Sequence, residues 1–249
     1  MTKSLRILRL MKILITALIL AASTFAAAPA NATERLTVIE LFTSQGCSSC
    51  PPADAMLKTL RDRPNVLTLS WAVDYWDRLG WKDTFGSRYN TNRQSAYNRR
   101  FGRWGNYTPQ MVFDGRTEGV GSRTSEVRKA FEKARNTDIP YLTPELTLKG
   151  GTVELALKNH AAMKNVSVRI VWFLADATVQ IGRGENGGRH LEYTNVVLDT
   201  EVFNGWDGTA KSFILNADKA RAIGADHVAV LLQDKNEHGP IIGAAAIHL

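Results

Sequence analysis

Cysteine is scarce in this chain, which has only Cys47 and Cys50 among its 249 residues. Two cysteines cannot supply the several cross-links that hold small disulfide-rich domains together. They also cannot build a zinc site with four cysteine ligands. With 44% hydrophobic and 22% charged residues, the composition excludes a disordered or collagen-like chain. A chain of this length can bury a substantial core.

Long apolar runs are missing outside the N-terminal region, and residues 1–32 contain no acidic residue. Within them, a basic segment precedes the apolar run Ile13–Ala28, and Ala30-Asn31-Ala32 forms an A-x-A site. This order predicts a secretory signal peptide over residues 1–32, cleaved after Ala32. The alternative is an uncleaved anchor, but the run is shorter than the roughly 20 residues that a spanning helix needs. We expect an exported protein, periplasmic or extracellular, with no membrane segment after cleavage.

The net charge of +7 is small once the predicted signal peptide is set aside. Four of the 31 basic residues are Lys3, Arg6, Arg9 and Lys12, so residues 33–249 keep 27 basic and 24 acidic residues. A net charge of +3 does not indicate a polyanion-binding surface. We therefore expect no nucleic-acid partner.

The hydrophobic pattern divides the remaining chain into two predicted domains, residues 33–138 and 139–249. In the first, strands and helices alternate. The expected strands are 36–42, 66–73 and 110–113, and the expected helices are 51–63, 87–101 and 124–135. In the second, short β-branched runs separated by Gly, Asn and Asp predict an all-β, sandwich-like domain. The expected strands are 145–149, 152–158, 166–174, 191–198, 211–215, 227–233 and 241–248.

The two cysteines form a C-x-x-C motif between a predicted strand and a predicted helix. Pro51 and Pro52 suit the first turn of a helix. The positive end of a helix dipole and its unpaired N–H groups favour a thiolate. We therefore predict Cys47 as the nucleophile and Cys50 as the resolving thiol of a redox centre. Two alternatives stay open: a structural disulfide, although so small a ring gains little chain-entropy stabilisation, and a two-thiolate Cu(I) site.

The order strand, C-x-x-C, helix and later Thr108-Pro109 resembles the thioredoxin-like superfamily over roughly residues 36–136. The resemblance implies an α/β thioredoxin-like domain followed by the all-β domain. It also implies that Pro109 is a cis-proline facing the disulfide and that Thr108 helps to bind an extended substrate.

More narrowly, residues 42–52 read FTSQGCSSCPP, which is similar to an uncharacterised family of exported bacterial proteins. Residues 71–81 and 183–197 resemble two further signatures of that family. Unlike ordinary thioredoxins, this chain has Leu41 where their buried acid lies. Glu40 is one residue further back, where the period-two rule of a strand places it on the other face. It is a candidate proton shuttle or a structural acid.

Acidic and aromatic residues follow the second predicted strand. Asp74 and Trp76 would lie at the same sheet edge as the C-x-x-C motif, where they could line a substrate groove. The alternative for this segment, above all for Trp71 and Trp81, is a hydrophobic lid that packs on the β half.

Two further patterns have plain explanations. Five arginines within residues 88–103 indicate a solvated helix face more than an anionic partner site. Residues 182–187 spell G-x-G-x-x-G, but a strand rather than a helix follows, so we predict a hairpin loop.

Together these features predict thiol–disulfide exchange with an exported protein or peptide that carries a thiol or disulfide. The reaction needs no cofactor, and no resident metal is expected. The rival hypotheses are a binding or assembly module with a structural disulfide and a Cu(I) carrier.

Overall fold

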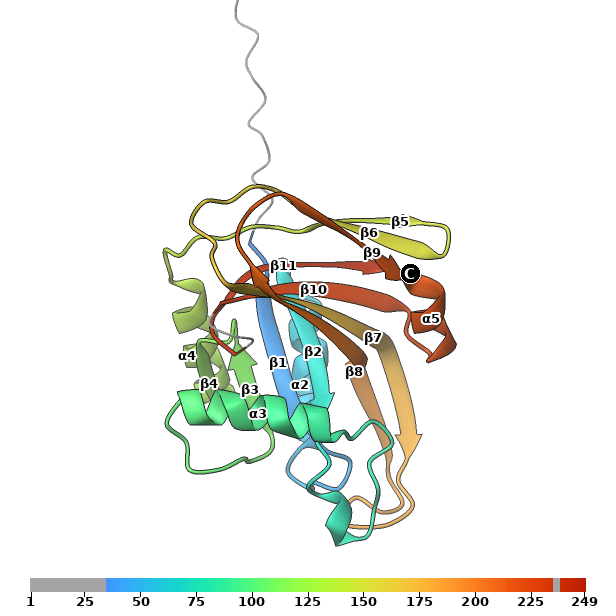
Figure 1. Cartoon of the computed structure of the whole chain (residues 1–249). Helices are drawn as coiled ribbons and strands as arrows, with labels where there is room; N and C mark the ends of the chain where they lie inside the picture. Colours follow the sequence, from blue (N-terminus) through green and yellow to red (C-terminus); the bar gives the residue numbers. More distant parts are fainter. Residues whose placement is uncertain (1–34, 235–237) are drawn as a thin grey trace, which may run out of the picture. The chain divides into compact units, whose positions relative to one another are not determined.

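An eight-stranded sheet organises the part of the chain that the computed structural model describes, residues 35–234 and 238–249 (Figure 1). Its strand order is β11-β10-β7-β8-β2-β1-β3-β4, and a smaller sheet has the order β5-β6-β9. With helices packed on the large sheet, the fold is mixed α/β. The predicted signal peptide, residues 1–32, lies outside the described residues.

The elements follow the predicted order closely. The first half contains β1 (Thr37–Thr43), α2 (Pro51–Arg61), β2 (Val66–Ala72), the 3-10 turn η1 (Asp77–Leu79), α3 (Arg88–Arg100), β3 (Gln110–Phe113), β4 (Thr117–Val120) and α4 (Thr124–Arg135). The second half contains β5 (Glu145–Lys149), β6 (Thr152–Leu157), β7 (Val166–Gln180), β8 (His190–Trp206), β9 (Lys211–Asn216), α5 (Ala217–Ala222), β10 (His227–Gln233) and β11 (Ile241–His248). No helix in these described parts is long and apolar enough to cross a membrane.

Strand β1 lies inside the sheet and is buried on both faces. It runs parallel to β2 and antiparallel to β3. Ile39 and Leu41 pack with α2 and α4 on one face, whereas Val38 and Phe42 join a second core cluster on the other face. Because β1 and β2 are parallel, their carboxyl ends meet at one sheet edge, as predicted.

The predicted boundary between residues 138 and 139 does not divide the sheet, and this corrects the expectation of a separate β domain. Strand β8 lies beside β2, with Ser70 opposite Val196, and Asn195 Nδ2 donates to the Thr68 carbonyl at 2.9 Å. Strands β7, β8, β10 and β11 therefore extend the sheet that β1 to β4 begin (Figure 1). The physical reason is that β2 is buried on both faces, and the backbone N–H and C=O groups on each edge of such a strand need a partner strand.

The core also crosses that boundary. Phe42 and Trp71 share one cluster with Phe173 and Leu231. The β5-β6-β9 sheet packs through a different cluster onto β7 and β10. By its contacts, Arg35–Leu249 is one compact unit.

Strands β7 and β8 form a long antiparallel hairpin whose loop is residues 181–189. The loop contains the G-x-G-x-x-G pattern, and the predicted hairpin loop is confirmed. Gly184 and Gly188 have φ values of 78° and 81°, which glycine adopts most easily. This loop reaches the cysteines.

Candidate redox site

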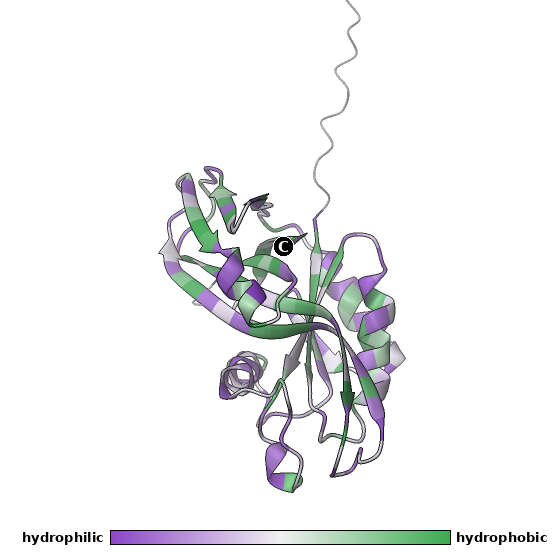
Figure 2. Ribbon diagram, turned by 90° about the vertical axis from the view of Figure 1, so that its right-hand side faces the viewer, coloured by the Kyte–Doolittle hydropathy of each residue, from purple (hydrophilic) through white to green (hydrophobic). Residues whose placement is uncertain are grey.

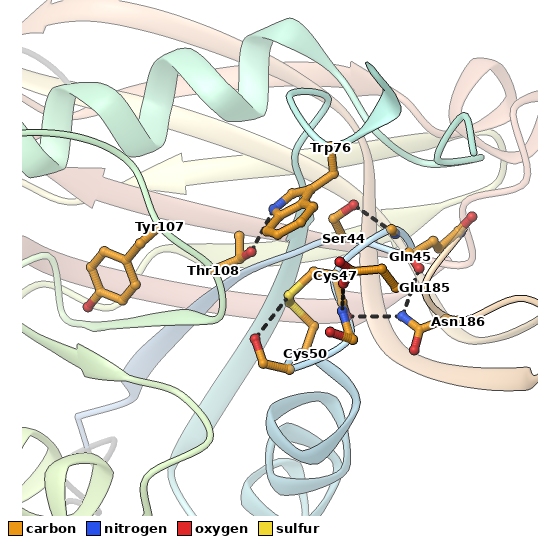
Figure 3. The surroundings of a disulfide bond; sticks show 12 residues. Ser44, Gln45, Cys47, Cys50, Trp76, Tyr107, Thr108, Glu185 and Asn186 are labelled. Atoms are coloured by element: carbon orange, nitrogen blue, oxygen red, sulfur yellow. Dashed lines mark hydrogen bonds between the residues drawn. A yellow bond between two sulfur atoms is a disulfide. The ribbon is translucent and has the colours of Figure 1, made fainter. Parts of the chain in front are cut away.

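Cys47 and Cys50 form a disulfide where β1 leads into α2, with 5.4 Å between their Cα atoms (Figure 3). The Cys47 amide donates to the Ser44 carbonyl at 3.1 Å, and the Cys50 amide donates to the Cys47 carbonyl at 3.2 Å. These bonds form the turns that precede the helix. Both cysteines are 0% exposed, although Ser48 and Ser49 between them are exposed.

The first turn of α2 offers fewer hydrogen-bond donors than we predicted from a helix N-terminus. Cys50 is the N-cap, and the next two residues are prolines, which have no N–H. The amides of Ala53 and Asp54 donate to the Cys50 carbonyl at 2.8 and 3.1 Å. A Cys47 thiolate would therefore depend mainly on the helix dipole rather than on free N–H groups from this turn.

Trp76 links the cysteine turn to the predicted Thr108-Pro109 loop. Its Nε1 donates to Thr108 Oγ1 at 2.8 Å, and a Cβ added at Gly46 would lie 3.2 Å from Trp76 Cβ. The Thr108–Pro109 peptide bond is cis. Figure 3 shows Trp76 and Thr108 together on one side of the disulfide. The structure thus brings three predicted features of the site into one neighbourhood.

Asp74 is bonded to helix α3 rather than to this neighbourhood. Its Oδ1 accepts from Thr91 Oγ1 at 2.6 Å, and its amide donates to the same hydroxyl at 3.2 Å. Arg88 Nε lies 3.4 Å from its Oδ2. These contacts join the end of β2 to the start of α3.

Of the two tryptophans expected as a lid, Trp71 is a core residue and Trp81 lies at the hairpin loop. Trp71 is 0% exposed. Trp81 Nε1 donates to Gln45 Oε1 at 2.8 Å, and a Cβ at Gly182 would come within 2.9 Å of the Trp81 ring. Trp81 therefore packs between the cysteine turn and the β7–β8 loop.

The β7–β8 loop contributes side chains that were not among the predicted site residues, although residues 183–197 resembled a family signature. Asn186 Nδ2 donates to the carbonyls of Gln45 and Cys47 at 2.9 and 3.0 Å. Glu185 Oε2 accepts from the Ser48 amide at 3.1 Å. In Figure 3 both residues lie on the side of the disulfide opposite Thr108. A segment almost 140 residues from the cysteines thus holds the turn that carries them.

Glu40 belongs to a buried polar network on the α3 face of the sheet. Arg93 Nε donates to Glu40 Oε1 at 2.7 Å, and Tyr97 OH donates to Glu40 Oε2 at 2.6 Å. Gln233 completes the network by donating to Tyr97 OH at 2.7 Å. Of the two roles expected for Glu40, these contacts fit the structural acid.

Helix α3 is polar on its buried side as well as on its exposed side. Figure 2, which views the helix end-on, shows little green on it, whereas the sheet strands are largely green. Arg93 is 2% exposed, and its guanidinium lies 4.9 Å from the Trp71 ring. The predicted solvated face therefore does not include Arg93.

Asp54, four residues after Cys50, is the buried acid that sequence reasoning missed. It is 6% exposed, and burial, with a smaller contribution from the Asp83 charge, raises the pKa of Asp54 to about 8. The nearby Thr43 hydroxyl lowers this pKa in part, whereas Asp54 Oδ1 and the Tyr193 hydroxyl are buried with no hydrogen-bond partner among the described residues. The signal was its spacing, because Asp54, Leu57 and Leu60 lie on the buried side of α2.

Asp54 also lines a cleft of about 450 Å³ between α2 and β8, together with Pro51, Lys58, His190 and Glu192. Water in this cleft would give the buried carboxyl a route for proton exchange. Within the described ranges, no group of three or more His, Cys, Asp or Glu side chains is placed to hold a metal ion.

The fold and the site define a mixed α/β protein with a C-x-x-C disulfide at the edge of its main sheet. Residues 38–233 match the family model described as "Protein of unknown function (DUF1223)", and the chain belongs to this family. The predicted membership of an uncharacterised family is thereby confirmed.

Two solved structures are similar to this chain. Protein AGR_C_4864 from Agrobacterium tumefaciens is 33% identical, with a TM-score of 0.73, over 87% of this chain and 96% of that one. HBP35 of Porphyromonas gingivalis is 14% identical, with a TM-score of 0.59, over 87% of this chain and 76% of that one, and supports the fold alone. A search of curated proteins finds no match.

Proposed function

We propose that this protein exchanges disulfides with an exported protein or peptide through Cys47 and Cys50. The observation that carries the proposal is the Cys47–Cys50 bond at the junction of a central strand and a helix, beside Trp76. The thioredoxin-like arrangement is part of the same proposal. Its support is the parallel β1–β2 pair with α2 between them in sequence and the cis Thr108–Pro109 bond.

The proposed reaction conserves electrons through a mixed disulfide. The Cys47 thiolate attacks one sulfur of the partner's disulfide, and the partner's other sulfur leaves as a thiolate. Cys50 then attacks the Cys47 sulfur of the mixed disulfide and releases the partner's second thiol. The partner gains two electrons and the Cys47–Cys50 disulfide forms; the reverse sequence oxidises a partner dithiol.

Asp54 is suited to exchange the proton of Cys50 in this sequence. Residues four apart on a helix lie on the same face, and both Cys50 and Asp54 are buried. A carboxyl with a pKa of about 8 holds a proton near neutral pH and can also give it up. It would accept the proton when Cys50 attacks and return it when Cys50 leaves.

Export is the second part of the proposal. It is supported by the basic residues, apolar run and A-x-A site within residues 1–32. Disulfides persist in exported proteins, so a protein of this kind would meet oxidised and reduced partners there. Sequencing the N-terminus of the protein recovered from a bacterial periplasm should find residue 33 first; an intact N-terminus would contradict cleavage.

A second candidate function is a binding or assembly module in which the disulfide is structural. The observation that favours it is the burial of both cysteines, each 0% exposed. A structural disulfide needs no access for a partner's sulfur, whereas exchange requires the surroundings of Cys47 to open.

Trapping with Cys50→Ser distinguishes the two functions. Without the resolving thiol, the mixed disulfide on Cys47 should accumulate in cells that export the protein, and it should disappear on reduction. The matched control is the Cys47→Ser variant, which should trap far less. If Cys50→Ser captures no partner and both single variants behave alike, the structural module is favoured. Tight Cu(I) binding that either substitution abolishes would instead indicate a carrier.

A further inference from the structure

The β7–β8 loop places a carboxylate at the backbone between the two cysteines. Glu185 Oε2 lies 3.1 Å from the Ser48 amide nitrogen, and Ser48 directly follows Cys47. The adjacent Asn186 fixes the loop by its bonds to the Gln45 and Cys47 carbonyls. Arg189 Nη1 in turn donates to Asn186 Oδ1 at 2.8 Å. The position of the carboxylate is therefore built by the loop and does not depend on Glu185 alone.

Glu185 carries its charge at neutral pH. Its hydrogen bonds with Ser48 lower the pKa of the Glu185 carboxyl below the ordinary value of 4.5. The Glu185 carboxylate also occupies the Ser48 N–H, a donor that could otherwise stabilise a thiolate on Cys47. Pro51 and Pro52 have no N–H, so the donor that remains beside the Cys47 sulfur is the Ser49 hydroxyl, whose oxygen lies 3.4 Å from it.

The other titratable groups around the turn are two acids, Asp83 and Asp54, and the two arginines of the loop, Arg183 and Arg189. Asp83 Oδ2 accepts from the Gln45 amide at 2.7 Å, and burial raises the pKa of Asp83. Asp54, on α2, has a pKa of about 8. Arg189 is the cation of this loop that is bonded to Asn186, so it lies behind the amide rather than at the Ser48 N–H.

We propose that Glu185 disfavours the Cys47 thiolate and so shifts the redox equilibrium of the site toward the disulfide. A negative charge close to a thiol favours its neutral form. The disulfide is neutral, so Glu185 does not repel it. The reduced site carries a negative charge whenever Cys47 is ionised, and Glu185 repels that charge. In biological terms, which rest on the proposed exchange function, the loop would make the protein a better reductant of its partner and a weaker oxidant.

Glu185→Gln tests the electrostatic part with little change of shape, because the amide oxygen can still accept from Ser48. The pKa of Cys47 in the reduced protein is read from the pH dependence of its alkylation by iodoacetamide. We expect the Cys47 pKa to fall by about 0.5–1 unit, since Glu185 is exposed and solvent screens its charge. The shift should shrink in 1 M salt.

The equilibrium with glutathione gives a second measurement. Protein disulfide and two glutathione thiols exchange to protein dithiol and one glutathione disulfide. Above the Cys47 pKa, Glu185→Gln should favour the dithiol by about three- to tenfold, the same factor as the pKa shift, by linkage. Well below that pKa the variant and the wild type should agree, because Cys47 is then neutral. A difference caused only by a change of structure would persist at low pH.

Asp176→Asn is the matched control, because it removes an exposed carboxylate of β7 that pairs with Arg61. It should leave both measurements unchanged. If Glu185→Gln folds normally yet leaves the Cys47 pKa and the glutathione equilibrium unchanged, the inference is wrong. Both measurements use the purified protein without its partner. A failure to trap a partner with Cys50→Ser would therefore reject the proposed function and not this inference.

Discussion

Two buried carboxylates, Glu40 and Asp54, show how differently the two faces of the sheet treat negative charge. Glu40 is 0% exposed but accepts hydrogen bonds from Arg93 and Tyr97 on the α3 face. Asp54 is nearly as buried on α2, yet its Oδ1 has no hydrogen-bond partner in the described part of the chain. The first acid is paired with a cation, whereas the second is not.

The difference teaches which buried acid can do proton chemistry. Glu40 has a guanidinium beside it, and any step that removed this pairing would strand a buried cation. An unpaired buried carboxyl is easier to keep neutral, which is why burial raises the pKa of Asp54 to about 8. The contrast therefore favours a structural role for Glu40 and makes Asp54 the acid that fits the proposed exchange reaction.

The largest effect should come from breaking the paired site. Arg93→Met leaves the Glu40 carboxylate buried without its cation, which should lower the free energy of unfolding by about 3–5 kcal/mol. Chemical denaturation of the oxidised protein measures it. The double variant Glu40→Gln/Arg93→Met should recover part of the loss. If the single and double variants lose the same free energy of unfolding, the Glu40–Arg93 pairing is not the cause of the loss.

The unpaired site should respond to pH in the opposite sense from a salt-bridged acid. Folding raises the Asp54 pKa from 3.8 to about 8, so the folded state binds this proton more tightly than the unfolded chain. The free-energy cost that the buried Asp54 carboxyl adds to folding is absent below about pH 4 and grows as the pH rises to 8. Relative to the wild type, Asp54→Asn should gain roughly 2–4 kcal/mol between these pH values, less than the full shift because cleft water relieves burial. Denaturation at pH 4, 6 and 8 measures the change; a constant difference would contradict it.

A smaller effect should come from removing a single hydroxyl of the Glu40 network. Tyr97→Phe deletes the donor to Glu40 and the acceptor used by Arg93 and Gln233. We expect a loss of about 1–2 kcal/mol, because the ion pair itself remains. Thermal unfolding monitored by circular dichroism measures the loss, and glutathione exchange kinetics should stay unchanged. Slower exchange would place this network in the redox site after all.

The smallest effect should come from Asp74, which follows β2 and bonds to Thr91 of α3. Asp74→Ala removes its bond with Thr91 and should cost about 1 kcal/mol or less, as its side chain is 21% exposed. Thr91→Val offers a matched removal of the same bond, and the two losses should not add. If Asp74→Ala instead changes partner trapping by Cys50→Ser, Asp74 contacts the substrate as first expected.

Much of this comparison could be predicted from the sequence where the signals are local. The apolar residues of β1 and the prolines after Cys50 indicate the strand, the turn and the helix within a few residues of where they lie. The two-residue period of a strand also placed Glu40 on the face away from Leu41, which the core clusters bear out. Its partner Arg93 lies 53 residues later, and no periodicity identifies such a pair.

The parts that could not be predicted depend on which strands become neighbours. Glu185 and Asn186 reach the cysteines only because β8 lies beside β2. Hydrophobic patterns identify strands but not their order in a sheet, so the second half read as a separate domain. Asp54 was missed for another reason. An acid in the first turn of a helix is normally explained as a surface residue that the helix dipole stabilises, but Asp54 is buried.

The pairing of β2 with β8 also determines which fragments of this protein could fold on their own. A fragment ending at residue 138 would keep both cysteines but lose β8, and β2 would become an open edge. Its side chains Leu67, Leu69 and Trp71, buried in the whole chain, would lose the strands that cover that edge. Exposed apolar edges of this kind recruit strands from other molecules, so such a fragment should self-associate on expression. The C-terminal half thus protects the half that carries the Cys47–Cys50 disulfide from aggregation.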